Sequence, residues 1–160
     1  MKLRLGLIGA LILAYLAMPL SAAALNDTTD SAMPLNAATT SAADTLIGNS
    51  GGAFRYFRID YAGGGAPVPI SMRAQPGRGT GGVATGFKVY GPTGLIGEAV
   101  VNDQSTSDST YALTIANTVA GAYYVQVYNF IQGLPLNFQL SVQGLAPPPA
   151  PAPAPAPAEG

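Results

Sequence analysis

The chain has 160 residues and a formal net charge of −1, and only 9% of its residues are charged. Cysteine, histidine and tryptophan are absent, which excludes disulfides, thiol nucleophiles and the side chain best suited to acid–base chemistry near neutral pH. Since the few basic residues form no cluster, nucleic acid is not an expected partner.

Residues 1–24 have the organisation of a secretory signal peptide. Lys2 and Arg4 precede an apolar run over Leu5–Met18, and small residues follow up to Ala24. The run is shorter than the roughly 20 residues that span a bilayer, so cleavage is favoured over a retained anchor. We therefore expect a secreted, extracellular or cell-surface protein without a membrane span after cleavage.

Two low-complexity segments flank the part that is expected to fold. Residues 25–50 are rich in Ala, Ser and Thr, and we expect them to be flexible apart from a short edge strand over Asp44–Gly48. Residues 146–160 form a Pro-Ala-rich tail, and positions 147–158 hold seven of the 14 prolines. This composition favours a stiff polyproline II spacer, which we interpret as a stalk, with an unselected tail as the alternative.

Residues 51–145 show the apolar–polar alternation of β-strands and no helical period. The expected strands, in chain order, are centred on Ala53–Ala62, Val68–Met72, Phe87–Val89, Leu95–Val101, Tyr111–Ile115, Tyr123–Val127 and Leu136–Val142. Short strands separated by Gly and Pro turns predict an all-β, antiparallel two-sheet sandwich of about seven strands, jelly-roll or immunoglobulin-like, with disordered termini.

The second of these strands is the expected edge of a sheet. Its buried row is Val68, Ile70 and Met72, and prolines 67 and 69 cannot donate to a ladder on both sides. An unpaired edge is a template for another chain. We therefore consider it a candidate surface for assembly with copies of the same chain.

The clearest strand, Tyr123–Val127, presents a second row of side chains opposite its buried face. The candidate ligand-binding residues on this row are Tyr124, Gln126, Tyr128 and Phe130. Exposed tyrosines beside amides can stack on sugar rings or proline-rich peptides and donate a hydrogen bond. The alternative is that they pack under a loop or pair across the sheet with Tyr56 or Tyr90.

Other motifs in the sequence favour ordinary structural interpretations. Gly77–Gly82 fits a dinucleotide fingerprint, but strand residues follow it where a helix is required. Asp103 and Asp108 are calcium candidates in a polar loop that lacks the glycine and glutamate of an EF-hand, and a solvated hairpin is favoured. Nothing in the sequence places Asp60 beside Glu98 as a catalytic pair. We expect no enzyme, no catalytic residue and no cofactor, with calcium as the one open exception.

Four of the strand motifs together resemble the bacterial pre-peptidase C-terminal domain. They are Tyr56–Ile59, Phe87–Gly94, Ala120–Val127 and Phe138–Val142, and the resemblance covers residues 51–145. It implies a small secreted β-sandwich of the kind appended to extracellular proteases and other hydrolases. Some relatives bind collagen or polysaccharide with the help of calcium, but their acidic ligands have no clear counterpart here.

These observations lead to three hypotheses about function. The first is a non-catalytic interaction module at the cell surface or in the extracellular matrix, which binds a polysaccharide or a protein polymer. The second is a structural subunit that assembles with copies of itself or with an envelope protein. The third is an accessory chain of a secreted hydrolase.

Overall fold

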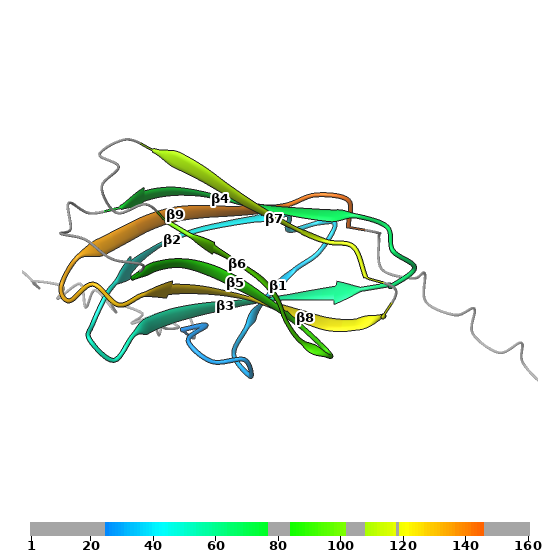
Figure 1. Ribbon diagram of the computed structural model, residues 1–160, viewed down its shortest axis with the longest axis horizontal. Coiled ribbons are helices and arrows are strands. Elements are labelled where there is room, and N and C mark those ends of the chain that lie inside the picture. Colours follow the sequence, from blue (N-terminus) through cyan, green and yellow to red (C-terminus); the bar gives the residue numbers. More distant parts are fainter. Residues whose placement is uncertain (1–24, 77–83, 102–107, 118, 146–160) are drawn as a thin grey trace, which may run out of the picture.

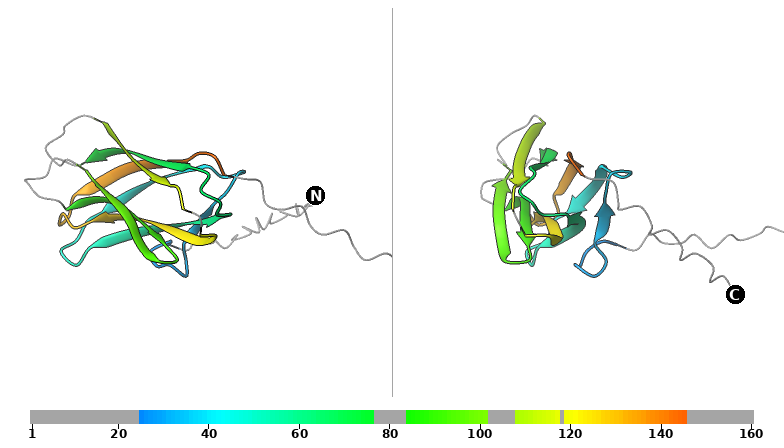
Figure 2. Two further views of the ribbon diagram at one scale, coloured as in Figure 1. Left: turned by 45° about the vertical axis from the view of Figure 1, so that its right-hand side comes forward. Right: turned by 90° about the vertical axis from the view of Figure 1, so that its right-hand side faces the viewer.

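The structure is a computed structural model that describes residues 25–76, 84–101, 108–117 and 119–145. The strands in these ranges are β1 Met33–Leu35, β2 Ser41–Ile47, β3 Ala53–Tyr61, β4 Val68–Pro76, β5 Thr85–Gly91, β6 Gly94–Val100, β7 Ser109–Ile115, β8 Gly121–Asn129 and β9 Pro135–Val142. They form a five-stranded sheet in the order β1-β3-β8-β5-β6 and a four-stranded sheet in the order β2-β9-β4-β7. The two sheets lie face to face (Figures 1 and 2), so the predicted all-β sandwich is confirmed.

The core lies between the sheets and comes from alternate positions of the strands, as the period of two requires. On β3 the buried side chains are Phe57, Ile59 and Tyr61, and on β9 every second residue from Leu136 is buried. The rings of Phe57 and Phe138 meet edge to face across the two layers, with centroids 6.1 Å apart. Packing of these two inner faces is the main stabilising contribution to the fold.

The prediction that residues 25–50 are flexible is wrong, because this segment contributes β1 and β2. β1 pairs with β3 in parallel, and β2 pairs with β9 along its whole length, Ser41–Ile47. The two strands bury only a few apolar side chains, above all Leu35 and Leu46. Backbone hydrogen bonds compensate for the small number of buried apolar side chains, because each of these strands pairs with the edge of the sheet formed by the other strands. The short edge strand expected at Asp44–Gly48 is confirmed up to Ile47, where β2 ends.

The prediction that β4 is an edge strand is also wrong, because β4 lies between β9 and β7. Its residues Val68, Ile70 and Met72 are at most 2% exposed, so they cannot form an assembly surface. Pro69 is tolerated because it lies next to the end of β9. There its carbonyl accepts from Gln143 N at 2.9 Å, and its missing N–H removes no bond within the β9 ladder.

One ion pair joins the two layers along the side where β2 and β3 lie close together. Asp44 on β2 accepts from Arg55 Nε on β3 at 2.5 Å, and the Arg55 side chain is 16% exposed. The contact links the N-terminal segment to the first strand of the predicted core. It helps to fix β2 over the five-stranded sheet.

Several sequence predictions fall outside the described residues. These are the leader at 1–24, the glycine motif at 77–82, Asp103 and the Pro-Ala tail at 146–160. Among the described residues, no helix has the length and apolar character to cross a membrane.

Candidate functional site

The outer surface of the five-stranded sheet carries tyrosines on three neighbouring strands. In the pairing register, Tyr56 on β3 lies opposite Gln126 on β8, and Tyr90 on β5 lies opposite Tyr124 on β8. All four side chains are partly exposed. On β8, the residues that alternate with Tyr124 and Gln126 are buried. We call Tyr56, Tyr90, Tyr124 and Gln126 the tyrosine face.

Gln126 is the centre of hydrogen bonding in the tyrosine face. Its Nε2 donates to Tyr56 Oη at 2.5 Å, and its Oε1 accepts from Tyr90 Oη at 3.3 Å. One amide therefore holds two phenol rings on either side of β8, which is the cross-sheet pairing that the sequence left open as an alternative. Since Tyr56 accepts this bond, its own O–H remains able to donate to a bound molecule.

Tyr124 differs from the other two tyrosines of this face because Gln126 does not hold its hydroxyl. Its hydroxyl makes no hydrogen bond with the other described residues. Arg58 lies opposite Tyr124 in the register and forms an ion pair with Asp60 at 2.8 Å. This hydrogen bond with Asp60 raises the pKa of Arg58. The tyrosine face thus ends beside a permanent positive charge.

The prediction that Tyr128 belongs to the exposed row is wrong, because its side chain is 2% exposed. Its neighbour on β5 is Gly86, and a Cβ at that position would lie 2.6 Å from Tyr128 Oη. The missing side chain lets the ring lie across β5 and reach Glu98 Oε1 on β6 at 2.7 Å. Lys88 Nζ lies 5.4 Å from the ring centroid. Burial, and then the hydrogen bond with Glu98, raises the pKa of Tyr128.

Phe130 follows the last residue of β8 and is 41% exposed. Its ring packs edge to face on Phe54, with centroids 5.7 Å apart, and Phe54 in turn lies 6.3 Å from Tyr56. The aromatic surface therefore continues from the tyrosine face to this corner of the sheet. Of the four candidate residues, Tyr124 and Gln126 lie on the tyrosine face and Phe130 lies at the corner of the sheet. Tyr128 is buried.

The two carboxylates considered as a catalytic pair are held by different partners. Asp60 pairs with Arg58 on β3, whereas Glu98 on β6 accepts from Tyr128 and lies 3.5 Å from Lys88 Nζ. Strands β8 and β5 lie between them. The structure therefore does not bring them together as general acid and base.

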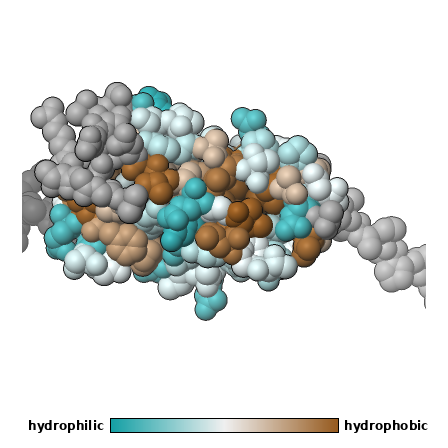
Figure 3. All heavy atoms as spheres, in the orientation of Figure 1, coloured by the Kyte–Doolittle hydropathy of each residue, from teal (hydrophilic) through white to brown (hydrophobic). Residues whose placement is uncertain are grey.

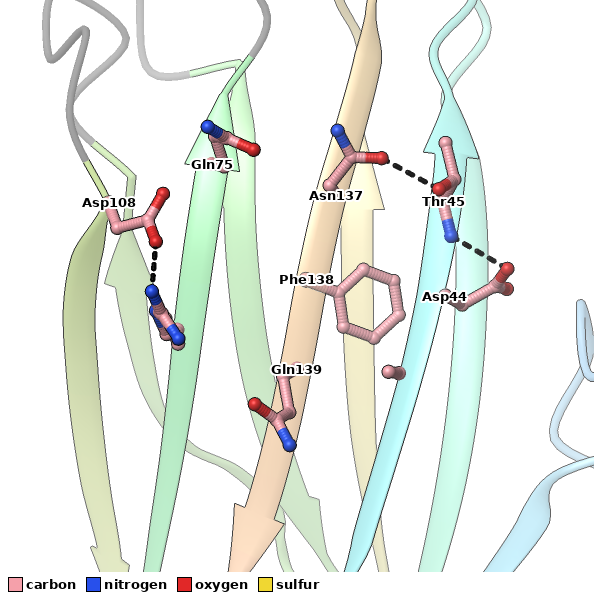
Figure 4. Close-up of a pocket in the computed structure, with 9 residues that line it drawn as sticks. Asp44, Thr45, Gln75, Asp108, Asn137, Phe138 and Gln139 are labelled. Atoms are coloured by element: carbon pink, nitrogen blue, oxygen red, sulfur yellow. Dashed lines mark hydrogen bonds and ion pairs between the residues drawn. The ribbon is translucent and has the colours of Figure 1, made fainter.

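A second surface, on the outer side of the four-stranded sheet, is hollowed and polar (Figure 4). Its volume is about 480 Å³, and its polar side chains come from all four strands of the sheet or their ends. These side chains, which we call the polar groove, are Asp44, Thr45, Arg73, Gln75, Asp108, Asn137 and Gln139. Thr45 Oγ1 donates to Asn137 Oδ1 at 2.7 Å. The outward positions of Asn137 and Gln139 follow from the sequence, but the groove requires the alignment of β4 and β2 beside them.

Asp108, one of the two calcium candidates, forms an ion pair with Arg73 at the side of the polar groove. In the described ranges, no three acidic residues lie close enough together to hold a metal ion. Asp103 lies outside these ranges. Calcium binding therefore stays a prediction.

The fold and its surfaces define a two-sheet β-sandwich domain with aromatic side chains on one outer face and polar side chains on the other. No family model matches the chain, and no curated protein matches it. Among solved structures, the chain is similar to the pre-peptidase C-terminal domain of a collagenase from Bacillus anthracis, with 18% identity and a TM-score of 0.46. The match covers 69% of this chain and 91% of that chain. This similarity concerns the fold alone. The solved structure is of the domain family that the strand motifs resemble.

Proposed function

We propose that this chain is a secreted, non-catalytic binding module whose tyrosine face holds an extended polymer, either a polysaccharide or a protein fibre. One observation carries the proposal: three partly exposed tyrosines lie on adjacent strands, and the Gln126 amide holds two of them, Tyr56 and Tyr90, on either side of the third. A flat aromatic surface with hydroxyl groups suits a long ligand with an apolar side and many polar groups.

The hydrogen bonds of Gln126 support a preformed site. The rings of Tyr56 and Tyr90 are already fixed through this amide, so little side-chain entropy is lost when a ligand binds. The composition supports the absence of catalysis, since the chain has no histidine or cysteine. The signal-peptide pattern at residues 1–24 supports secretion.

Co-sedimentation with insoluble polymers tests this proposal. The chain from Leu25 onward would be incubated with cellulose, chitin, collagen fibrils and bacterial envelopes, with and without calcium. The double variant Tyr90→Ala and Tyr124→Ala is expected to bind at least about tenfold more weakly, since loss of a central aromatic contact usually costs more than 1 kcal/mol. Tyr128 is left intact because it is buried and its loss would test stability instead.

A matched control variant is Gln139→Ala, which changes an exposed side chain on the outer face of the other sheet. It should bind like the unchanged chain, and circular dichroism and thermal unfolding should show that all variants fold. Equal binding by the double variant would contradict the proposed site. Failure of the unchanged chain to pellet with any polymer would contradict the proposed function.

A second candidate function is self-assembly through β6, which is one of the two edge strands of the five-stranded sheet. Its side chains Leu95, Ile96 and Val100 are 56%, 37% and 36% exposed, and apolar surface gathers on the side of the molecule where β6 lies (Figure 3). An apolar edge strand is a template for pairing with another chain. Leu95→Lys should then convert an oligomer to a monomer in sedimentation velocity, and unchanged oligomers would exclude β6.

A further inference from the structure

The Pro-Ala segment at residues 147–158 is a possible ligand that the chain itself carries. Seven of its twelve residues are proline, and it contains no charged side chain. Such a sequence favours polyproline II, in which the backbone carbonyls make no internal hydrogen bonds. Since proline has no N–H, the segment offers apolar rings and many hydrogen-bond acceptors, but few donors.

The tyrosine face offers the complementary groups. Proline-rich segments bind to surfaces lined with aromatic side chains, where proline rings pack on the aromatic rings and tyrosine hydroxyls donate to carbonyl oxygens. Tyr56 has an O–H free to donate because its oxygen already accepts from Gln126. The Tyr124 side chain is partly exposed, and its hydroxyl makes no hydrogen bond with the other described residues.

The position of Leu145 indicates whether the segment reaches the tyrosine face of its own molecule or that of a neighbouring molecule. Leu145 packs against the hydrophobic core and lies with Tyr61 and Val68 around a small cavity at one end of the sandwich. Only Ala146 separates it from Pro147, and a residue before proline has restricted backbone freedom. To lie on its own tyrosine face, the chain would have to reverse direction within this short stretch and pass from one sheet to the other.

The length of the segment is sufficient to span the face of a neighbouring molecule. Twelve residues in polyproline II extend about 37 Å. Strand β8, with nine residues, extends about 31 Å. If the segment adopts the conformation that its composition favours, it would reach a second molecule from Leu145 more easily than it would fold back.

We propose that the tyrosine face of one copy binds the 147–158 segment of a second copy. The inference rests on the proposed function, because it names one partner for the same face. The contact joins two different surfaces, so a pair of copies still has one free segment, on the copy whose face is occupied, and one free face, on the other copy. Such head-to-tail contacts produce open chains or rings.

Two complementary defective chains test this arrangement, each starting at Leu25. One carries Tyr124→Ser and so keeps the segment but has a defective face. The other ends at Leu145 and so keeps the face and every described residue but has no segment. In sedimentation velocity the unchanged chain should form oligomers that grow with concentration. Each defective chain should stay monomeric, and their mixture should form only a 1:1 dimer.

A synthetic peptide of residues 146–160 provides the direct binding measurement. Titrated into the chain that ends at Leu145, it should shift the backbone NMR signals of β3, β5 and β8. Tyr124→Ser in that chain should weaken peptide binding at least about tenfold, whereas Gln139→Ala should not change it. Folding of each variant is checked by its NMR spectrum.

Three results would overturn the proposal. One is a peptide that does not bind the face, and another is a set of oligomers that persist in both defective chains. The third is peptide binding combined with an unchanged chain that stays monomeric, which would mean that the segment binds its own face. Co-sedimentation of the chain that ends at Leu145 with polymers distinguishes this failure from failure of the proposed function, because it tests the face without the segment.

Discussion

Substitution of Tyr128 by Phe removes one hydroxyl from the outer face of the five-stranded sheet and leaves the ring in place. This hydroxyl donates to Glu98 Oε1 at 2.7 Å, and the tyrosine is 2% exposed. Glu98 also lies 3.5 Å from Lys88 Nζ, a contact that does not involve this hydroxyl and that we expect the variant to keep. The substitution therefore isolates a single hydrogen bond to a carboxylate.

The expected cost at neutral pH is about 1.5–2 kcal/mol in the free energy of unfolding. Hydrogen bonds to charged groups are worth about 1.5–3 kcal/mol, and we take the lower part of this range because the Glu98 side chain is 37% exposed. Water can therefore replace part of the lost contact.

The same substitution has a pH dependence with a defined sign. The folded protein raises the pKa of Tyr128 through burial and through the hydrogen bond with Glu98. Below about pH 10, the pKa of tyrosine in an unfolded chain, the side chain is protonated in both states and its contribution is complete. Above that pH the unfolded chain loses the proton first, so the contribution falls, by about 1.4 kcal/mol at pH 11.

Urea unfolding of both proteins at pH 7, 9, 10 and 11 measures this effect. Every other residue is the same in both proteins, so the difference between them reports Tyr128. We expect the difference to be constant from pH 7 to pH 9 and to approach zero at pH 11. A difference that is absent at pH 7, or that does not change with pH, would refute the assigned hydrogen bond and burial.

Three further substitutions test the packing around this site and the end of β8. Gly86→Ala should destabilise the protein by about 1–3 kcal/mol in thermal or urea unfolding, since the new Cβ would lie 2.4 Å from the Ala99 carbonyl oxygen. Asn129→Ala should cost about 3 kcal/mol, because the buried amide donates to the carbonyls of Leu46 and Leu134; a loss below 1 kcal/mol would contradict this role. Thr85→Val should stabilise the protein by about 1 kcal/mol in the same assay, because the buried hydroxyl has no hydrogen-bond partner among the described residues; a lower midpoint would contradict the assignment.

The strands and their inner faces could be predicted because side-chain alternation is a local property of an extended backbone. Phe57, Ile59 and Tyr61 are buried as the pattern indicates. The hairpin turn after Tyr90 is equally local, because Pro92 and Gly94 meet the backbone requirements of a tight turn. Such features depend on residues that are neighbours in the chain.

The position of each strand in its sheet could not be predicted in this way. β4 reads as an edge because of its prolines, yet it is a central strand whose Pro69 lies where β9 ends. β2 has little apolar character and is a strand because β9 offers it a complete ladder. In both cases the partner strand, and not the local sequence, determines the outcome.

The sequence by itself determined that the chain is a β-sandwich and that Tyr124 and Gln126 lie on the opposite side of β8 from its core residues. Only the tertiary structure decided which of the candidate residues form a surface together. Gln126 meets Tyr56 from 70 positions away, and Tyr128 is buried because its neighbour across the ladder is Gly86. The physical reason is that alternation assigns a side chain to a face, whereas exposure depends on side chains brought alongside by pairing with distant strands.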